Sequence, residues 1–452
     1  MNNKLLYDIQ DKPKKIKEWV LYALQQVLAV FVATVLIANL CGTPVSSCLL
    51  GACLGTLIYQ VITKFRSPMF ISSSGATVSA VTGALVLSGV SEQNYLMVAI
   101  GGLVIVIIYI LFAIIIKIKG IQAINKVFPA TVIGPVTMVI GLNLSKFLIT
   151  YCGEFGMIDA SGTVLNANGI SSTYIICSIL VAIFTMLVIA VSSHYFKGFL
   201  KTIPFLIGLA AGYILALILT VTNVANLVSF EPFNHLQWYP DVTFLKWNSG
   251  DFSFSNLGQT VLFFAPVAIC ALLEHMADHK TLSNIIGTDL TENPGLHRTL
   301  IGDGVASALG TVVCGLPNTS YGESIATTGF SKVASVWVIT AAAAFLGLLS
   351  FIAPVSALIQ TIPSCVFGGC AMILYGFITA SGLKTLIREK VDLENNKNLI
   401  IISVILTSGV GGIVLSFALG NNKFFSFAGV ALAMILGVIL NLILKEPKEK
   451  TK

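Results

Sequence analysis

One polar stretch of the sequence is enclosed by apolar residues on both sides and reads Cys314-Gly-Leu-Pro-Asn-Thr-Ser-Tyr-Gly-Glu-Ser-Ile-Ala-Thr-Thr-Gly-Phe-Ser-Lys332. A second stretch resembles it and reads Phe70-Ile-Ser-Ser-Ser-Gly-Ala-Thr-Val-Ser-Ala-Val-Thr-Gly83. In each, a short segment that we expect to be extended leads into a helix at a glycine, Gly75 or Gly322. Non-helical backbone occurs at membrane depth only where it is buried in protein or lines a cavity, and matched interruptions mark transporter sites. The two stretches therefore predict a transporter with its substrate bound between them.

The composition indicates a polytopic membrane protein. Of the 452 residues, 56% are hydrophobic and 10% are charged, and the mean hydropathy is +0.91, so the charged residues are too few to cover a soluble globule. The formal net charge of +6 is distributed over the connections between apolar runs and gives no support to nucleic-acid binding. The nine cysteines lack any Cys-x-x-Cys spacing, so we interpret them as packing residues and expect no metal or cofactor. No nucleophile–base pair is apparent, and an enzyme is not expected.

Apolar runs divide the chain into about fourteen predicted transmembrane helices, most of them near the ~20 residues that a bilayer requires. They lie near residues 19–40, 45–63, 76–90, 94–116, 128–149, 172–193, 202–222, 257–277, 296–313, 322–331, 334–353, 357–383, 398–418 and 424–444. Basic residues gather in alternate connections, beginning with the tail at 1–18, whereas the connections at 41–44, 91–94, 151–171 and 222–256 carry few. The positive-inside rule then predicts a cell-membrane protein with both termini in the cytoplasm, and the first apolar run is too long for a cleaved signal peptide.

A second pair of similar segments predicts an internal repeat. The segment Pro129-Ala-Thr-Val-Ile-Gly-Pro-Val-Thr-Met138 parallels Pro363-Ser-Cys-Val-Phe-Gly-Gly-Cys-Ala-Met372, with Pro, Val, Gly and Met in the same register. Two halves of about seven spans follow, and an odd number of spans inverts the second half in the membrane. We therefore expect an all-α inverted repeat with broken helices 3 and 10. Residues 19–222 form its first half, 223–256 an extracellular loop, 257–445 its second half and 446–452 a cytoplasmic tail.

Three acidic residues are candidates for the chemistry of transport. Glu274 follows the apolar run at 261–273, and Asp278 lies four residues further on, on the same face of the expected helix. Glu323 lies in the first turn of the helix that begins at Gly322. Ionisable groups within membrane spans are costly and are functional by default. For Asp278 an alternative stays open, in which Asp278, His279 and Lys280 mark the cytoplasmic end of the helix.

These residues predict the chemistry of the substrate. Carboxylates at Glu274 and Glu323 accept hydrogen bonds from N–H groups, and backbone N–H groups near Gly75 and Gly322 donate to carbonyl oxygens. A planar ring with N–H and C=O groups along one edge fits such a lining. A carboxylate at the midplane is also a candidate proton carrier, and Tyr321 either stacks on the ring or packs in the core.

At this point the sequence resembles a known family, the nucleobase–ascorbate (nucleobase–cation symporter 2) transporters, and most closely the branch of the bacterial uracil permeases. The resemblance covers nearly the whole chain. It rests on Tyr7-Asp8, Asp11-Lys12-Pro13, Ala33-Thr34-Val35-Leu36, Glu274-His275, Asp289-Leu290, Asn293-Pro294-Gly295-Leu296-His297-Arg298 and Pro317-Asn318-Thr319-Ser320-Tyr321-Gly322-Glu323.

The resemblance implies proton-coupled uptake of uracil by alternating access. It also implies a core domain of spans 1–4 and 8–11, a gate domain of spans 5–7 and 12–14, and a homodimer formed through the gate domains. Glu274 and Glu323 would hold the pyrimidine edge, the backbone at Gly322 and Gly75 would complete the site, and Tyr321 would lie beside the ring. Glu274 and Asp278 would take part in proton coupling. The supporting residues would be Gln26, Ser74, Asn318 and Ser324.

The sequence also departs from the family pattern. It has Gln25-Gln26 where Gln-His is usual, Gly75 where uracil permeases have an aromatic residue, and Ser324-Ile325-Ala326 where Asn-x-Gly is usual. A smaller residue at Gly75 leaves room for a larger ring, so xanthine or another purine stays open as the substrate. An anion transporter or exchanger of the same architecture is a further alternative, which two acids in the site disfavour.

Overall fold

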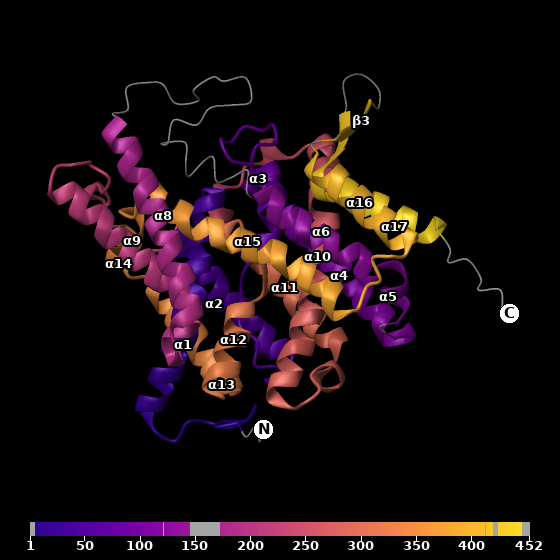
Figure 1. The fold of residues 1–452 in the computed structure, drawn as a ribbon, viewed down its shortest axis with the longest axis horizontal. Helices are drawn as coiled ribbons and strands as arrows, with labels where there is room; N and C mark the ends of the chain where they lie inside the picture. The colour runs from indigo at the N-terminus through magenta and orange to yellow at the C-terminus, as the bar shows by residue number, and fades with distance from the viewer. Residues whose placement is uncertain (1–4, 121, 145–171, 412, 419–423, 445–452) are drawn as a thin grey trace.

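The computed structural model describes residues 5–120, 122–144, 172–411, 413–418 and 424–444, so the connection predicted at 151–171 and the tail at 446–452 lie outside the described residues. The described chain is mostly helical (Figure 1). A helix occupies each of the fourteen ranges that the sequence predicts. These helices are α1 Ile16–Cys41, α2 Val45–Ile62, α3 Val78–Leu85, α4 Tyr95–Lys119, α6 Ala130–Leu144, α8 Ser172–Tyr195, α9 Pro204–Val221, α10 Phe254–Ile286, α11 Leu296–Cys314, α12 Gly322–Ser331, α13 Val336–Leu349, α15 Ser364–Arg388, α16 Asn396–Val410 and α17 Gly429–Ile443.

The ends of several spans differ from the prediction. Short helices α5 (Gln122–Val127) and α14 (Ala353–Gln360) precede α6 and α15, and α14 is bent by 78° from α13. The expected spans at 398–418 and 424–444 shorten to α16 and α17, of 15 residues each, because β3 (Val414–Ala418) and β4 (Phe424–Ala428) form an antiparallel hairpin between them. Glycines after Ser408 end the first helix, and the aromatic and β-branched residues that follow favour strands, so hydropathy alone extends both spans too far.

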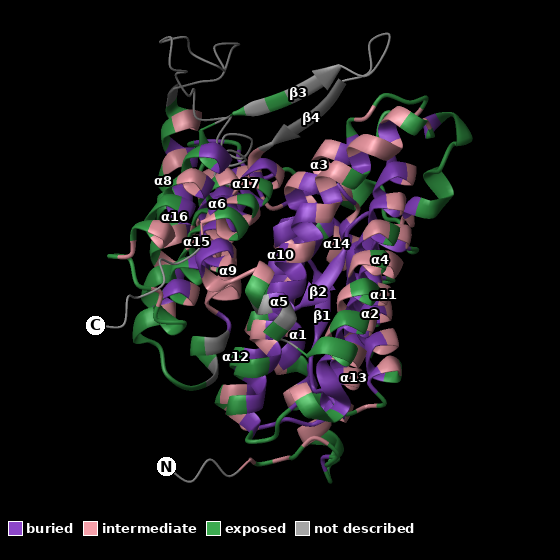
Figure 2. Ribbon diagram, turned by 90° about the vertical axis from the view of Figure 1, so that its right-hand side faces the viewer, coloured by how far each residue is buried: buried purple, intermediate pink, exposed green. Residues whose placement is uncertain are grey.

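The outer faces of the helices are apolar. On α4, the exposed residues Leu103, Ile107, Leu111 and Ile114 recur at helical spacing and form a stripe suited to lipid. Figure 2 shows exposed residues on the outer helices and buried ones along the centre. Among the described residues, seven helices are long and apolar enough to cross a bilayer, and the bent pair α13–α14 makes eight. The other predicted spans are α11, with 19 residues, and the shorter helices α3, α6, α12, α16 and α17.

Two short strands cross in the interior of the molecule. β1 (Ile71–Ser73) pairs antiparallel with β2 (Asn318–Ser320), so that Ile71 lies opposite Ser320 and Ser73 opposite Asn318. β1 continues through a 3-10 turn (η1, Gly75–Thr77) into α3, and β2 continues into α12 at Gly322. Both strands are buried (Figure 2). The predicted extended segments before broken helices 3 and 10 are therefore confirmed.

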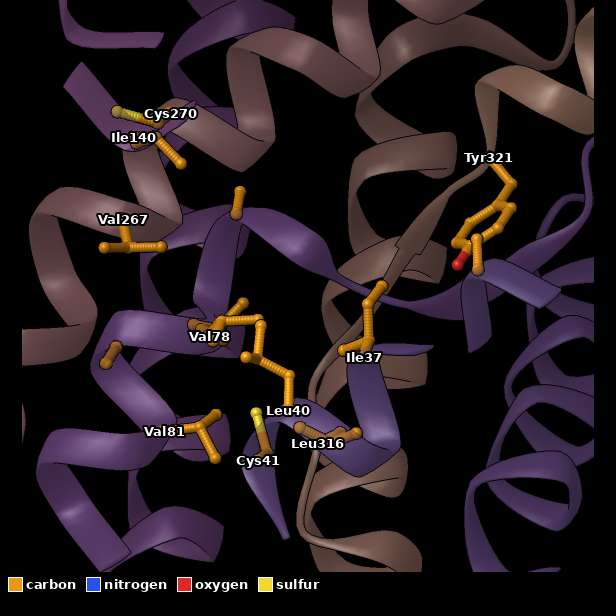
Figure 3. Close-up of a cluster of buried hydrophobic side chains, with 14 of the residues drawn as sticks. Ile37, Leu40, Cys41, Val78, Val81, Ile140, Val267, Cys270, Leu316 and Tyr321 are labelled. Atoms are coloured by element: carbon orange, nitrogen blue, oxygen red, sulfur yellow. The ribbon is translucent and has the colours of Figure 1, made fainter. Parts of the chain in front are cut away.

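A large apolar cluster surrounds the strand pair. Figure 3 shows part of it, in which Ile37 and Leu40 of α1, Val78 and Val81 of α3, and Leu316 before β2 gather. Burial of such side chains contributes roughly 1.5–3 kcal/mol each in water, but in a bilayer close packing of helices replaces much of this driving force. The cluster thus fixes α1 and α3 against the segment that leads to the site.

Candidate functional site

A cavity of about 760 Å³ lies between α10 and α12 on one side and α6 and α15 on the other. Its volume is in the range of ligand pockets. Its lining carries the acidic residues Glu274, Asp278, Glu389 and Asp392 and the basic residues Lys280, Lys384, Arg388 and Lys390. The lining includes Thr131 and Thr137 of α6, Glu274, Asp278 and Lys280 of α10, Gly322, Ile325 and Ala326 of α12, and Ser381, Lys384 and Arg388 of α15.

Helix α10 places two carboxylates on one wall of the cavity. It runs for 33 residues and continues past Asp278 to Ile286, where Gly287 in the left-handed conformation ends it. Asp278 therefore does not mark the helix end, which the sequence had left open. The side chain of Glu274 is exposed to the cavity, and Asp278 is half-buried. The hydroxyl of Ser320 donates a hydrogen bond of 2.8 Å to Asp278 Oδ2 and so joins the carboxylate to β2.

The start of α12 forms a second part of the cavity wall. Gly322 lines the cavity, and no atom lies within 4 Å of the position that a Cβ would take there. The first N–H groups of a helix lack partners within the helix and carry partial positive charge, so they suit a carbonyl oxygen. Glu323 is half-buried and is not part of the cavity lining, but it lies within electrostatic range of Glu274 and Asp278.

Four other predicted residues are buried outside the cavity lining, and three of them form hydrogen bonds between separate segments. The amide of Asn318 donates to the carbonyl oxygens of Gly51 (2.9 Å) and Ala306 (3.2 Å), and Ser74 N donates to Pro317 O over 2.8 Å. Gln26 Nε2 donates to Thr328 Oγ1 over 3.2 Å, which joins α1 to α12. Ser324 is buried at the first turn of α12. The structure therefore places these residues in the frame of the site.

Tyr321 and Gly75 also lie outside the cavity lining. Tyr321 is 5% exposed and belongs to the apolar cluster around Ile37 (Figure 3). A Cβ added at Gly75 would meet Ile378 Cδ1 at 3.6 Å and Ile37 Cδ1 at 3.7 Å, which is ordinary contact. A larger residue at position 75 would point at α15, where Ile378 lies.

A buried polar network lies behind the carboxylates, and the sequence reasoning missed it. Asp303 Oδ2 of α11 is 3.1 Å from His275 Nδ1 and 3.4 Å from Thr319 Oγ1 of β2. The rings of His275 and His279 lie 4.1 Å apart, and His279 Nε2 is 2.8 Å from the hydroxyl of Tyr59. Asp303 stands within the apolar run at 296–313, so the rule that singles out Glu274 applies to it equally. Within the described ranges, no group of His, Cys, Asp or Glu is arranged to hold a metal ion.

Comparison with known proteins identifies the family. Residues 17–417 match the model of the permease family. The uracil permease of Bacillus caldolyticus is 35% identical over 442 residues, which cover 98% of this chain and 95% of that protein. The chain belongs to the permease family. The uracil permease of Escherichia coli (strain K12) is 33% identical to this permease over 424 residues, 94% of this chain and 90% of that protein. The resemblance drawn from the motifs is thereby confirmed, and the permease is a multi-pass membrane transporter.

The fold is also found in a distant solved structure. The transmembrane domain of a cyanobacterium bicarbonate transporter, BicA, superposes with a TM-score of 0.61 at 15% identity, covering 96% of the permease and 99% of that domain. At this identity the likeness concerns the fold alone. It supports the predicted 7+7 inverted repeat, in which the antiparallel β1–β2 pair joins the two broken helices. The division into core and gate domains stays a prediction.

Proposed function

We propose that the permease imports uracil across the cell membrane by proton-coupled symport and alternating access. The observation that carries this proposal is one cavity lined by Glu274, Asp278 and the bare helix start at Gly322. Uracil presents ring N–H donors and carbonyl acceptors along its edge. The carboxylates accept from the N–H groups, and the first N–H groups of α12 donate to a carbonyl. The similarity to proteins named uracil permeases also supports uracil as the substrate.

The carboxylates also suit proton coupling. Glu274 and Asp278 share a helix face and a cavity, with Glu323 in electrostatic range. Three like charges so placed repel one another, and one proton bound together with the substrate relieves part of that repulsion. Glu274 and Asp278 are the proposed proton carriers because both line the cavity, while Glu323, which follows Gly322 but lies outside the lining, would have to turn toward the cavity to hold the ring.

The shape of the cavity supports alternating access. Its lining includes Lys280, Lys384 and Arg388, which the positive-inside rule assigns to the cytoplasm together with both termini. In this arrangement the cavity is open inward. Movement of α10 and α12 against α6 and α15 would close it and open a path on the opposite side.

The test is uptake of labelled uracil by cells that lack their own permease. Excess unlabelled uracil should abolish uptake, whereas xanthine, guanine, hypoxanthine and bicarbonate should not. Uptake competed by xanthine instead would move the permease to purines and make Gly75 and Ser324 the first positions to exchange. Transport of bicarbonate without any nucleobase would establish the anion alternative. An uncoupler should stop accumulation; uphill uptake that survives it and requires sodium would contradict proton coupling.

A further inference from the structure

The N-terminal segment Leu5–Pro13, here called the strap, contacts two linkers: the one before β1 and the one between α12 and α13. It lies at the same end of the molecule as α12 and α13 (Figures 1 and 2). Leu6 N donates to Lys332 O over 2.8 Å, Ala334 N donates to Tyr7 O over 2.9 Å, and Val336 N donates to Ile9 O over 3.0 Å. Tyr7 forms a parallel bridge with Val333. The strap thus adds a strand to the linker between α12 and α13.

The same strap holds the linker that precedes β1. Gln10 Nε2 donates to the carbonyl oxygen of Phe65 over 2.5 Å. Phe65 stacks on Trp337 with ring centroids 5.2 Å apart. Lys12 Nζ lies 4.1 Å from the centroid of the Trp337 ring. The strap therefore joins the linker before β1 to the linker after α12.

The two carbonyl groups that the strap binds belong to strained backbone. Phe65 has a φ of 54° and Lys332 a φ of 59°, the left-handed region that residues other than glycine rarely adopt. Such conformations persist where the surroundings hold them. The strap provides hydrogen bonds at both points, so it stabilises the turns that set the direction of β1 and of the end of α12.

Apolar side chains of the strap pack against a buried cluster that includes one residue of the cavity lining. Leu5 and Ile9 pack against a buried cluster that contains Ile71 of β1, Ile325 of α12 and Ala334. Ile325 also lines the cavity, one turn after Gly322. Leu6, between them in sequence, is 56% exposed. Leu5 and Ile9 therefore contact the cluster, whereas the side chain of Leu6 is exposed.

We propose that the strap is a positioning element of the transport site, which holds β1 and the C-terminal end of α12 and thereby keeps α12 in the orientation that binds substrate. The proposal rests on the proposed function for its substrate. Loosening the strap should leave the permease in the membrane but increase the motion of α12, and binding must then restrict that motion at a cost in affinity.

The experiment compares the double variant Leu5→Ala/Ile9→Ala with Leu6→Ala as a matched control. Hydrogen–deuterium exchange of purified protein should rise in the linkers at 63–70 and 331–336 and in α12 for the double variant only. The KM for uracil should rise about threefold or more, with turnover per inserted molecule less affected. The conservative variant Ile9→Val should behave as the parent. Gln10→Ala, which keeps the apolar contacts, should raise exchange at 63–70 and serves if the double variant fails to insert.

Two outcomes would overturn the proposal. Exchange in both linkers that matches the parent would show that the strap does not hold them. Faster exchange with an unchanged KM would show a purely structural role. If the parent itself fails to take up uracil, the proposed function is refuted, while the exchange comparison still tests the strap.

Discussion

Ser320 of β2 and Asp278 of α10 are joined by a hydrogen bond of 2.8 Å between Oγ and Oδ2. This bond connects the strand pair to the helix that carries Glu274 and Asp278, two of the carboxylates that line the cavity. Replacing Ser320 by Ala should free the Asp278 side chain and raise the KM for uracil about 10–100-fold, since hydrogen bonds to charged groups contribute roughly 1.5–3 kcal/mol and each 1.4 kcal/mol is about tenfold. Kinetics of uptake per inserted molecule measure this effect. Ser320→Thr keeps the hydroxyl and should remain near the parent; equal loss in both variants would point to steric damage.

Glu274→Gln and Glu323→Gln should each abolish uptake without loss of membrane insertion. Each change replaces a charged acceptor by a neutral amide, and we expect transport to fall by at least ~30-fold. Labelled uptake and the amount of inserted protein are measured together. Glu292→Gln, at an exposed position outside the cavity, is the matched control. Full transport by both site variants would refute the assignment of the substrate edge.

Gly310 of α11 should tolerate no side chain, because an added Cβ would clash with the backbone carbonyl oxygen of Leu316 and lie 2.9 Å from Cγ of Asn318. Gly310→Ala should destabilise the permease by roughly 1–3 kcal/mol through overpacking and reduce the amount of folded protein. Gly376→Ala on α15 is the control, since no atom lies within 4 Å of its Cβ position. Thermal unfolding in detergent measures the difference between the two variants. Equal melting temperatures would mean that the backbone at Leu316 and the side chain of Asn318 both move aside without cost.

Asp251, in the loop at 223–256, should make the free energy of unfolding depend on pH in the acid range. Burial acts to raise the pKa of this carboxyl, but hydrogen bonds from Ser91 N (2.9 Å) and Val90 N (2.8 Å) outweigh it and hold the pKa below its ordinary value. The ionised form therefore stabilises the fold above pH ~4, and this contribution is lost as the pH falls through the depressed pKa.

Asp251→Asn should accordingly lower the melting temperature at pH 7 by about 2–4 °C and reduce its dependence on pH below ~4. Glu231→Gln, an exposed acid of the same loop, is the control. An Asp251→Asn protein with the parent's pH dependence would show that other carboxylates govern acid stability.

Hydropathy and the two glycine-led stretches predicted the helices and the interior strand pair, because both follow from the demands of the bilayer on the backbone. Hydropathy could not predict where α16 ends and α17 begins, because aromatic strand residues such as those of Phe424–Ala428 are as apolar as the residues of a membrane helix. The extent of α10 past Asp278 was equally hidden, because a membrane helix can continue into a polar region wherever protein surrounds it.

The candidate site was predictable where a residue type is rare in membranes. Glu274 and Asp278 could be placed on one face of a helix from their spacing alone. The separation of Tyr321 from the cavity depends on the direction in which β2 turns into α12, which no local pattern encodes. Asp303 carried a usable signal, but its partners His275 and Thr319 come from separate elements that only the fold brings together.

The pairing of β1 with β2 means that neither half of the chain can complete the site alone. Each strand supplies hydrogen-bond partners for the other, and an unpaired strand edge is not tolerated at membrane depth. If the chain is divided within the loop at 223–256 and its halves are produced as separate polypeptides, transport should require both fragments in the same cell. Because β1 and β2 come from different halves, the two halves of the permease must assemble with each other to form the site.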